Sequence, residues 1–359
     1  MTQDINTDTE NNTAQNYPLN EAKILVLGQG SVGKTSLINR LILNEFDANE
    51  NMTDGINIQN WQVNINNENV RLNVWDFGGQ EIMHATHQFF LTKRSLYLLV
   101  LDARQEEQYS RIEYWLKLIQ VYGDDSPIII VLNKIDQHIL ELNEKFLQRK
   151  YPSIKSFIPV SCKENQGIEE LEQTIFSCIN QLPHIHDLLP KSWFSIKQKL
   201  QNMRRDFISY AEYEKLCERE NITALAQQTL ISFLHDLGIV LSFRDNGKYL
   251  HLQDTSILNP QWVTEGIYKI LNSHLLFQSK GILDIALLSS ILDMKRYPSN
   301  KHRFIIDIME KFELCFEFPE TNNRFLILDL LSVQEPDINW DFDDSLCFEL
   351  HYDVLPSSI

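Results

Sequence analysis

The sequence lacks several features that would assign it to a class of protein. Its five cysteines are few and odd in number, and no two are separated by two residues, which argues against a disulfide framework and a zinc site. No apolar run approaches the roughly 18 residues of a membrane-spanning helix, and the polar first 20 residues contain no apolar core of a signal peptide. We therefore expect a cytoplasmic protein without a membrane segment.

Positive charge is also scarce. Lys and Arg total 32 against 49 Asp and Glu, which gives a formal net charge of −17. A surface with this excess repels phosphate backbones and anionic lipids, so neither nucleic acid nor a membrane surface is an expected partner. With 43 % hydrophobic and 23 % charged residues, the composition is typical of a globular protein, and 359 residues suit two or three domains.

The chain divides into segments of different character. Residues 1–20 are rich in Asn and Thr and predict a disordered tail or linker. In residues 21–183, short apolar runs alternate with helical periodicity, which predicts an α/β domain with a mostly parallel sheet. Residues 184–190, beside two prolines, predict a linker, and residues 191–359 a second domain.

The second domain begins with helical patterns. They occupy residues 192–203, 210–219 and 224–237. Two short apolar stretches, 238–243 and 249–252, then flank Asp245-Asn246-Gly247, which is typical of a hairpin turn. Three helices followed by a hairpin predict an α+β module resembling a winged helix. Because acidic residues outnumber basic ones there, a protein contact is favoured over DNA.

A glycine-rich loop follows the first predicted strand. Residues 28–35 read G-Q-G-S-V-G-K-T and match the phosphate-binding pattern G-x-x-x-x-G-K-[ST]. Glycines let successive N–H groups point at phosphate oxygens, and the following helix adds the positive end of its dipole. We expect Lys34 to reach the β- and γ-phosphates and Thr35 to bind Mg²⁺. The expected nucleotide contacts of this loop are Gly28, Gly30, Ser31, Val32, Gly33, Lys34, Thr35 and Ser36.

Two other families share parts of this pattern. Residues 28–33 also match G-x-G-x-x-G of dinucleotide-binding folds and kinases, but Lys34-Thr35 directly afterwards belongs to the phosphate loop alone. Asp76-Phe77-Gly78 spells the kinase D-F-G. A kinase also needs an H-R-D-x-x-x-x-N loop between these two motifs, and the sequence has none, which excludes a kinase.

The better interpretation of residues 76–80 is the D-x-x-G-Q motif of G proteins, at the end of a predicted strand. We expect Asp76 to hold Mg²⁺ through a water molecule and the Gly79 N–H to sense the γ-phosphate. Gln80 is placed to orient the attacking water, with Lys34 and Gly79 as the other catalytic groups. Thr53 suits the first switch, in which a threonine binds Mg²⁺ only with the γ-phosphate present; the alternative is a polar turn residue.

Guanine recognition is indicated by Asn133-Lys134-Ile135-Asp136 after a buried strand. The Asp136 carboxylate can accept hydrogen bonds from guanine N1–H and the exocyclic amine, a donor pair that adenine lacks, so an ATPase is disfavoured. We expect Lys134 to lie along the base and Asn133 to tie this loop to the phosphate loop. Ser161-Cys162-Lys163 follows the next strand, with the Cys162 N–H available to guanine O6.

Some residues keep two interpretations. Arg104 is either structural, which we favour, or a source of positive charge for a transition state. His84 and His87 form H-x-x-H, but a switch helix explains them better than a metal site. His184 and His186 are expected to be solvated linker residues.

Together these motifs resemble the Ras superfamily, and their details resemble the Roco family, in which a Roc domain (Ras of complex proteins) precedes a COR domain (C-terminal of Roc). The Roc-like stretches are residues 74–81, 84–92 and 101–104. The COR-like stretches are residues 234–241, 257–264 and 352–357.

The resemblance implies a GTP-binding switch that binds GTP or GDP with Mg²⁺, hydrolyses GTP slowly and has its nucleotide state read by COR. The alternative is a nucleotide-dependent scaffold or dimerisation module with negligible hydrolysis. Family members continue COR into a second subdomain that mediates dimerisation, and residues 191–359 are expected to lack that part. Self-association is therefore expected of an intact member rather than of this chain.

Overall fold

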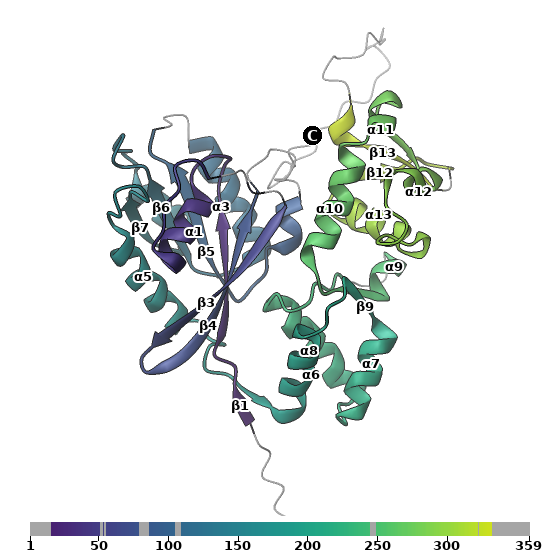
Figure 1. Ribbon diagram of the computed structural model, residues 1–359, viewed down its shortest axis with the longest axis horizontal. Helices are drawn as coiled ribbons and strands as arrows, with labels where there is room; N and C mark the ends of the chain where they lie inside the picture. Colours follow the sequence, from purple (N-terminus) through teal and green to yellow (C-terminus); the bar gives the residue numbers. More distant parts are fainter. Residues whose placement is uncertain are drawn as a thin grey trace, which may run out of the picture.

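The computed structural model describes residues 16–50, 53, 55–78, 86–104, 109–244, 249–321 and 323–331 (Figure 1). Its first domain is built on a six-stranded sheet of order β3-β4-β2-β5-β6-β7. The strands are β2 (Glu21–Leu27), β3 (Ile56–Ile65), β4 (Glu68–Phe77), β5 (Ser95–Asp102), β6 (Ile128–Asn133) and β7 (Ile154–Val160). All neighbouring pairs are parallel except β3 with β4, which confirms the predicted mostly parallel sheet.

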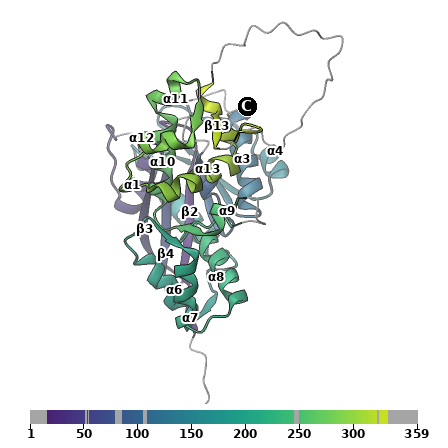
Figure 2. The ribbon, with the colours of Figure 1, turned by 90° about the vertical axis from the view of Figure 1, so that its right-hand side faces the viewer.

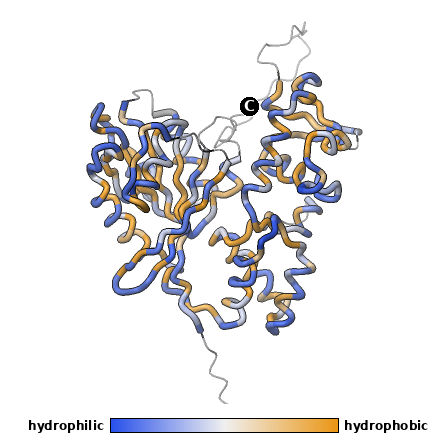
Figure 3. Tube along the Cα trace, in the orientation of Figure 1, coloured by the Kyte–Doolittle hydropathy of each residue, from blue (hydrophilic) through white to orange (hydrophobic). Residues whose placement is uncertain are grey.

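Helices cover both faces of this sheet, as alternation of side chains along buried strands requires. Ile24 and Val26 of β2 share one core with α1 (Lys34–Leu43) and α5 (Ile168–Asn180). Leu25 and Leu27 face the opposite way, into a core with α3 (Tyr109–Gly123) and α4 (Glu144–Lys150). The apolar colouring of the central strands in Figure 3 follows from this double burial.

The second domain starts with a helical unit. Helices α6 (Lys191–Gln201), α7 (Tyr210–Arg219) and α8 (Ala224–Asp236) form where the periodicity predicts them. The strands are β9 (Phe207–Ser209) and β10 (Thr255–Ile257), which pair antiparallel, and Leu241 bridges to Ile257.

The expected second hairpin strand at residues 249–252 is wrong. Residues 250–253 form the short helix α9 (Leu250–Gln253), which buries Leu252 while Leu250 stays exposed. Leu241 forms an antiparallel bridge with Ile257, which lies beyond the segment 249–252 that was expected to pair with residues 238–243. The Asp245-Asn246-Gly247 turn lies outside the described residues.

A second unit completes this domain (Figure 2). Pro260 starts α10 (Pro260–Leu271), where its missing N–H costs no hydrogen bond. The helices α11 (His274–Gln278), α12 (Leu288–Ile291) and α13 (His302–Lys311) accompany a three-stranded sheet of order β11-β13-β12. Its strands are β11 (Ile282–Asp284), β12 (Cys315–Glu317) and β13 (Arg324–Ile327); short 3-10 turns are η1 (Gln88–Phe90), η2 (Ile285–Leu287), η3 (Ser299–Lys301) and η4 (Leu328–Leu330). The expected strand at residues 347–351 lies outside the described residues.

The end of the predicted tail and the end of the predicted linker form a strand pair with each other. Strand β1 (Asn16–Pro18) pairs antiparallel with β8 (Leu188–Pro190), and Tyr17 stacks on Phe194 with ring centroids 5.0 Å apart. The polar composition around residue 16 gave no sign of a strand, because its partner lies more than 170 residues away along the chain. Residues 16–18 therefore differ from the expected disorder.

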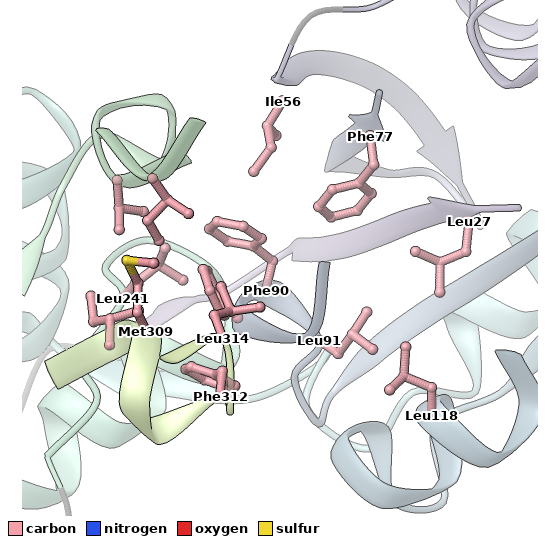
Figure 4. Packing of buried hydrophobic residues seen from close by; sticks show 14 of the residues in the cluster. Leu27, Ile56, Phe77, Phe90, Leu91, Leu118, Leu241, Met309, Phe312 and Leu314 are labelled. Carbon is pink, nitrogen blue, oxygen red and sulfur yellow. The ribbon is translucent and has the colours of Figure 1, made fainter. Parts of the chain in front are cut away.

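One apolar core runs continuously between the two domains (Figure 4). Phe77 and Phe90 of the first domain belong to the same buried cluster as Leu241, Met309 and Phe312 of the second. Burial of this extent makes the two domains one packed unit rather than separate bodies. Among the described residues, no helix has the length and apolar character needed to cross a membrane.

Candidate nucleotide site

A cleft of about 440 Å³ opens at the carboxyl ends of β2, β5 and β6, the edge at which parallel α/β sheets bind ligands. Strand ends and their loops bring predicted residues together there from four separate stretches of sequence. The predicted residues that line the cleft are Ser31, Gly33, Lys34, Thr35, Ser36, Thr53, Asn133, Lys134, Asp136, Cys162 and Lys163. The other predicted nucleotide-binding residues in the described part of the chain lie next to the lining residues without lining the cleft themselves. They are Gly28, Gly30, Val32, Asp76 and Ser161.

The glycine-rich loop has the backbone that its composition predicts. Gly33, the N-cap of α1, has φ +93°, and a Cβ there would lie 2.4 Å from Asn133 Nδ2. A Cβ on Gly28 would lie 2.3 Å from the carbonyl oxygen of Val100. Both positions therefore require glycine, and α1 starts directly behind the loop with its N-terminus toward the cleft.

Lys34 is buried, and its ammonium donates hydrogen bonds to the carbonyl oxygens of Gly28 (2.9 Å) and Gln29 (2.8 Å). Burial lowers the pKa of Lys34 to about 8, although the nearby Asp76 carboxylate opposes this. The side chain is thus folded back over the loop, with its positive charge held above the backbone that would receive phosphate.

Three oxygen-bearing side chains meet behind Lys34. Thr35 Oγ1 donates to Asp76 Oδ2 at 2.7 Å and lies 2.7 Å from Thr53 Oγ1, which is 3.2 Å from the same carboxylate oxygen. Asp76 Oδ1 is buried and has no hydrogen-bond partner among the described residues. Burial raises the pKa of Asp76, against the hydrogen bonds from Thr35 and Thr53. This set of oxygens, with one buried carboxylate oxygen unused, fits Mg²⁺.

The opposite end of the cleft is tied together by Asn133. Its Nδ2 donates to the Val32 carbonyl at 2.9 Å, while Oδ1 accepts from the N–H groups of Lys134 (2.9 Å) and Cys162 (3.3 Å). One amide therefore joins three loops. Ser161 Oγ donates to Asp136 Oδ1 at 2.6 Å, and this bond lowers the pKa of Asp136, so the carboxylate faces the cleft ionised. Lys163 is exposed and pairs with Glu164.

Arg104 lines the cleft, and its guanidinium is fixed by the buried carboxylate of Asp102. Its guanidinium forms a two-point hydrogen bond with Asp102, from Nε to Oδ1 at 2.9 Å and from Nη2 to Oδ2 at 2.7 Å. Asp102 also accepts from Lys134 Nζ. Asp102 was not among the predicted site residues; its position at the end of an apolar strand was the available signal.

The second-switch residues are only partly described. Gly79, Gln80 and His84 lie outside the described residues. His87 is buried, with Nε2 3.2 Å from the Gly78 carbonyl oxygen, and its ring lies between Phe77 and Trp115. No group of three possible metal-binding side chains occurs in the described part of the chain. His87 packs as a core residue.

The linker histidines differ from each other. His184 is fully buried, which contradicts the expected solvated position, and burial lowers its pKa to about 4. His186 is exposed and lies 3.8 Å from Glu68. Leu182, just before the linker, and Ile185 within it are both buried in the core of the first domain, and His184 between them is buried with them.

Two segments next to the predicted switches contact the second domain. After the second switch, Gln88 Nε2 donates to the Phe312 carbonyl at 2.8 Å, and the Phe89 and Phe312 rings lie 4.4 Å apart. Beyond the first switch, Gln261 Nε2 of α10 donates to the Ile56 carbonyl at 2.8 Å. Described residues that flank both predicted switch regions therefore contact the second domain.

The phosphate loop, the guanine-type loop and the mostly parallel sheet define a Ras-like G domain, followed by a second α+β domain. Comparison with known proteins agrees. Residues 23–136 match the family model "Ras of Complex, Roc, domain of DAPkinase", and residues 190–331 match "C-terminal of Roc, COR-A domain". The solved structure of Methanosarcina barkeri Roco2 RocCORdC bound to GDP is 48 % identical, with a TM-score of 0.82, over 89 % of this chain and 98 % of that one.

The chain therefore belongs to the Roco family, with a Roc domain followed by a COR domain. It is also similar to the probable serine/threonine-protein kinase pats1 of Dictyostelium discoideum, at 28 % identity over 84 % of this chain and 10 % of the relative. A Roc-COR-CHAT protease of Runella zeae is 27 % identical over 89 % of this chain and 36 % of the relative. The chain thus spans about a tenth to a third of the length of these curated relatives.

Proposed function

We propose that this chain is a switch that binds GTP and GDP with Mg²⁺, hydrolyses GTP slowly, and passes its nucleotide state from Roc to COR. The observation that carries this proposal is the convergence of Lys34, the Thr35–Thr53–Asp76 cluster and Asp136 on one cleft. The GDP-bound state of the similar Methanosarcina protein supports guanine-nucleotide binding.

The phosphate end of the cleft assigns roles to its side chains. Backbone N–H groups of residues 28–36 receive the phosphates, and Lys34 leaves its two carbonyl partners to contact the β- and γ-phosphates. Thr35 and Thr53 hold Mg²⁺ with their hydroxyl oxygens, and Asp76 holds it through water. Bound there, Mg²⁺ neutralises charge on the β- and γ-phosphate oxygens.

The base end recognises guanine. Asp136, oriented by Ser161, accepts from N1–H and the exocyclic amine, and the Cys162 N–H donates to O6. Lys134 lies along the base, and Lys163 supplies a further contact at the rim. Gln80 orients the attacking water and Gly79 senses the γ-phosphate.

We propose that COR reads the nucleotide through the two contacts that it makes next to the predicted switches. When the γ-phosphate orders Thr53, the start of β3 is fixed, and Gln261 holds the Ile56 carbonyl there. When it orders the loop containing Gly79, the segment leading to Gln88 and Phe89 is fixed against Phe312. We also propose Roc at residues 21–183, a linker at 184–190 and COR from residue 191.

Removing Lys34 tests the assignment. The Lys34→Ala variant should lose GDP binding in calorimetry with Mg²⁺ present, because Lys34 is the cation held at the Gly28 and Gln29 carbonyls of the glycine-rich loop, where the phosphates are expected. The exposed Lys155→Ala is the matched control and should bind as the parent does. Unchanged GDP affinity in Lys34→Ala would overturn the assignment, and ATP competing as well as GTP would revive an ATPase.

A nucleotide-dependent scaffold is the second candidate, and the continuous core between Roc and COR favours it, since a packed unit can present one surface. Single-turnover GTP hydrolysis measured beside light scattering separates the two. Hydrolysis without change in mass supports the switch, whereas assembly that depends on the nucleotide without hydrolysis supports the scaffold. Self-association of this chain is part of that second candidate.

A further inference from the structure

Asp102 ends β5 beneath the base end of the cleft and is only 1 % exposed. Its Oδ1 accepts from the N–H (3.0 Å) and Nε of Arg104, and its Oδ2 accepts from Arg104 Nη2 and, at 2.9 Å, from Lys134 Nζ. Burial alone would raise the pKa of Asp102, but these hydrogen bonds outweigh it and lower the pKa to about 2. The carboxylate is therefore a fixed negative charge.

Hydrogen bonds hold Lys134 at both its backbone N–H and its ammonium group. Its backbone has φ +68°, a conformation that non-glycine residues rarely adopt, and its N–H is held by Asn133. At the other end, Nζ donates to Asp102 and, at 2.5 Å, to the Ser31 carbonyl. Its Cε passes 4.0 Å from the position of a Cβ on Gly33. The apolar stem thus spans the cleft from the base loop to the phosphate loop.

Among the described residues, Asp102 is the anionic partner of Lys134. The Ser31 carbonyl alone would leave the ammonium on a single neutral acceptor, and a lysine stem has four rotatable bonds that burial and pairing must restrain. Arg104 neutralises the rest of the carboxylate, so Asp102 can stay ionised in a buried position.

We propose that Asp102 is a positioning residue for nucleotide binding: it anchors the Lys134 ammonium so that the lysine stem forms a rigid platform for the purine ring. This inference rests on the proposed guanine-nucleotide site. Asp102 is buried and does not line the cleft, so we expect it to affect every purine alike. Asp136, in contrast, reads hydrogen-bond donors on one edge of the base.

The experiment is a double-mutant cycle on the full chain with Asp102→Asn, Lys134→Met and the double variant. Dissociation of GDP and of IDP, whose base lacks the exocyclic amine, is timed for each by displacement of a fluorescent analogue. Asp102→Asn should speed dissociation of both nucleotides by about tenfold and to the same extent. In the Lys134→Met background it should have little further effect, because its target is gone.

Several comparisons make the result decisive. Asp136→Asn should change the GDP-to-IDP ratio, and Asp102→Asn should leave it unchanged. Asp124→Asn removes an exposed carboxylate paired with Lys93 and should match the parent. Asp102→Ser is measured in parallel, with thermal unfolding of each variant, so that misfolding of one variant does not decide the outcome.

If Asp102→Asn sped nucleotide dissociation equally in the parent and in the Lys134→Met background, Asp102 would not act through Lys134 and the proposal would be overturned. A change in the GDP-to-IDP ratio in Asp102→Asn would overturn it as well. If the parent chain itself bound neither GDP nor IDP, the proposed nucleotide site would fail instead. The two failures are therefore distinct.

Discussion

The side-chain amide of Gln261 in COR donates a hydrogen bond to the main-chain carbonyl of Ile56 at the start of β3 in Roc. Ile56 is next to Gly55, whose carbonyl accepts from the Gly78 N–H at 2.9 Å. Gly78 belongs to the D-x-x-G-Q motif, and Gly55 lies two residues after Thr53. One short chain of hydrogen bonds therefore links both switch regions to α10 of COR.

Replacing Gln261 by Leu should weaken the response of COR to the nucleotide. Loss of the donor leaves the Ile56 carbonyl without its partner and should cost about 1 kcal/mol of stability. If this contact distinguishes the two nucleotide states, the ratio of GTP-analogue to GDP affinity should shift by up to about fivefold. Calorimetric titration with both nucleotides measures the ratio.

The exposed Gln278→Leu on α11 is the control for the added apolar side chain. A lower stability of Gln261→Leu with an unchanged affinity ratio would mean that this contact holds the domains together without carrying nucleotide information. Differential hydrogen exchange at residues 55–58 would then be expected to show no dependence on the nucleotide.

Gly238 is a second point at which COR meets Roc closely. Its φ is +71°, and a Cβ there would lie 2.9 Å from Trp75 and 3.1 Å from Lys23. Gly238→Ala should therefore lower the free energy of unfolding by about 1 kcal/mol for the backbone and a further 1–3 kcal/mol for overpacking. Urea unfolding measures this.

Gly55→Ala is the matched control for the backbone cost, since Gly55 has φ +74° and its nearest neighbour, Thr264, would lie 3.9 Å from the added Cβ. The difference between the two variants isolates the contact with Trp75 and Lys23. Equal destabilisation would show that COR shifts to accommodate the methyl group at no cost.

The nucleotide cleft was predictable because its residues lie at strand ends in a fixed order. The glycine-rich loop and the residues from Asn133 to Asp136 each follow an apolar run, and Asp76 lies near the end of an alternating strand. The parallel strands β4, β2, β5 and β6 bring these ends to one edge of the sheet. The predicted helices and strands of Roc follow the same periodicity. These are local signals, each contained within about ten residues.

What the sequence did not reveal depends on distant partners. Strand β1 exists only because Leu188–Pro190 pairs with it, and His184 is buried only because its neighbours enter the Roc core. Lys23 begins an apolar run, and nothing in the neighbouring sequence indicated that its ammonium would be fully buried beside COR. The position of Asp102 at the end of an apolar strand was visible, but its pairing with a lysine 32 residues further along was not.

Lys23 predicts a specific pH dependence. Its ammonium donates to the Phe90 carbonyl (2.7 Å) and Thr92 Oγ1 (3.1 Å) and lies 4.3 Å from the centroid of the Trp75 ring. Burial lowers the pKa of Lys23 from 10.5 to about 7, against the attraction of Asp236. Between these values the unfolded chain binds more protons than the folded one, so the contribution of Lys23 to stability rises with pH.

The difference in unfolding free energy between the parent and Lys23→Met should therefore increase in favour of the parent above pH 7. The slope should approach about 1.4 kcal/mol per pH unit, and the difference should be flat below pH 7, where both states hold the proton. Urea unfolding at three pH values measures it, with the exposed Lys155→Met as the control. A difference that stays constant from pH 7 to 9 would show that the folded amine keeps its proton.

Gln80→Leu addresses hydrolysis separately from binding. Gln80 lies outside the described residues, so this prediction rests on its place in the D-x-x-G-Q motif, four residues after Asp76. Loss of the amide removes the group expected to orient the attacking water, and the single-turnover rate should fall by about a hundredfold. GDP affinity should stay unchanged, since Asp76, Thr35 and the glycine-rich loop are intact. Gln62→Leu, at an exposed position of β3, is the control; equal rates in both variants would assign the water to another residue.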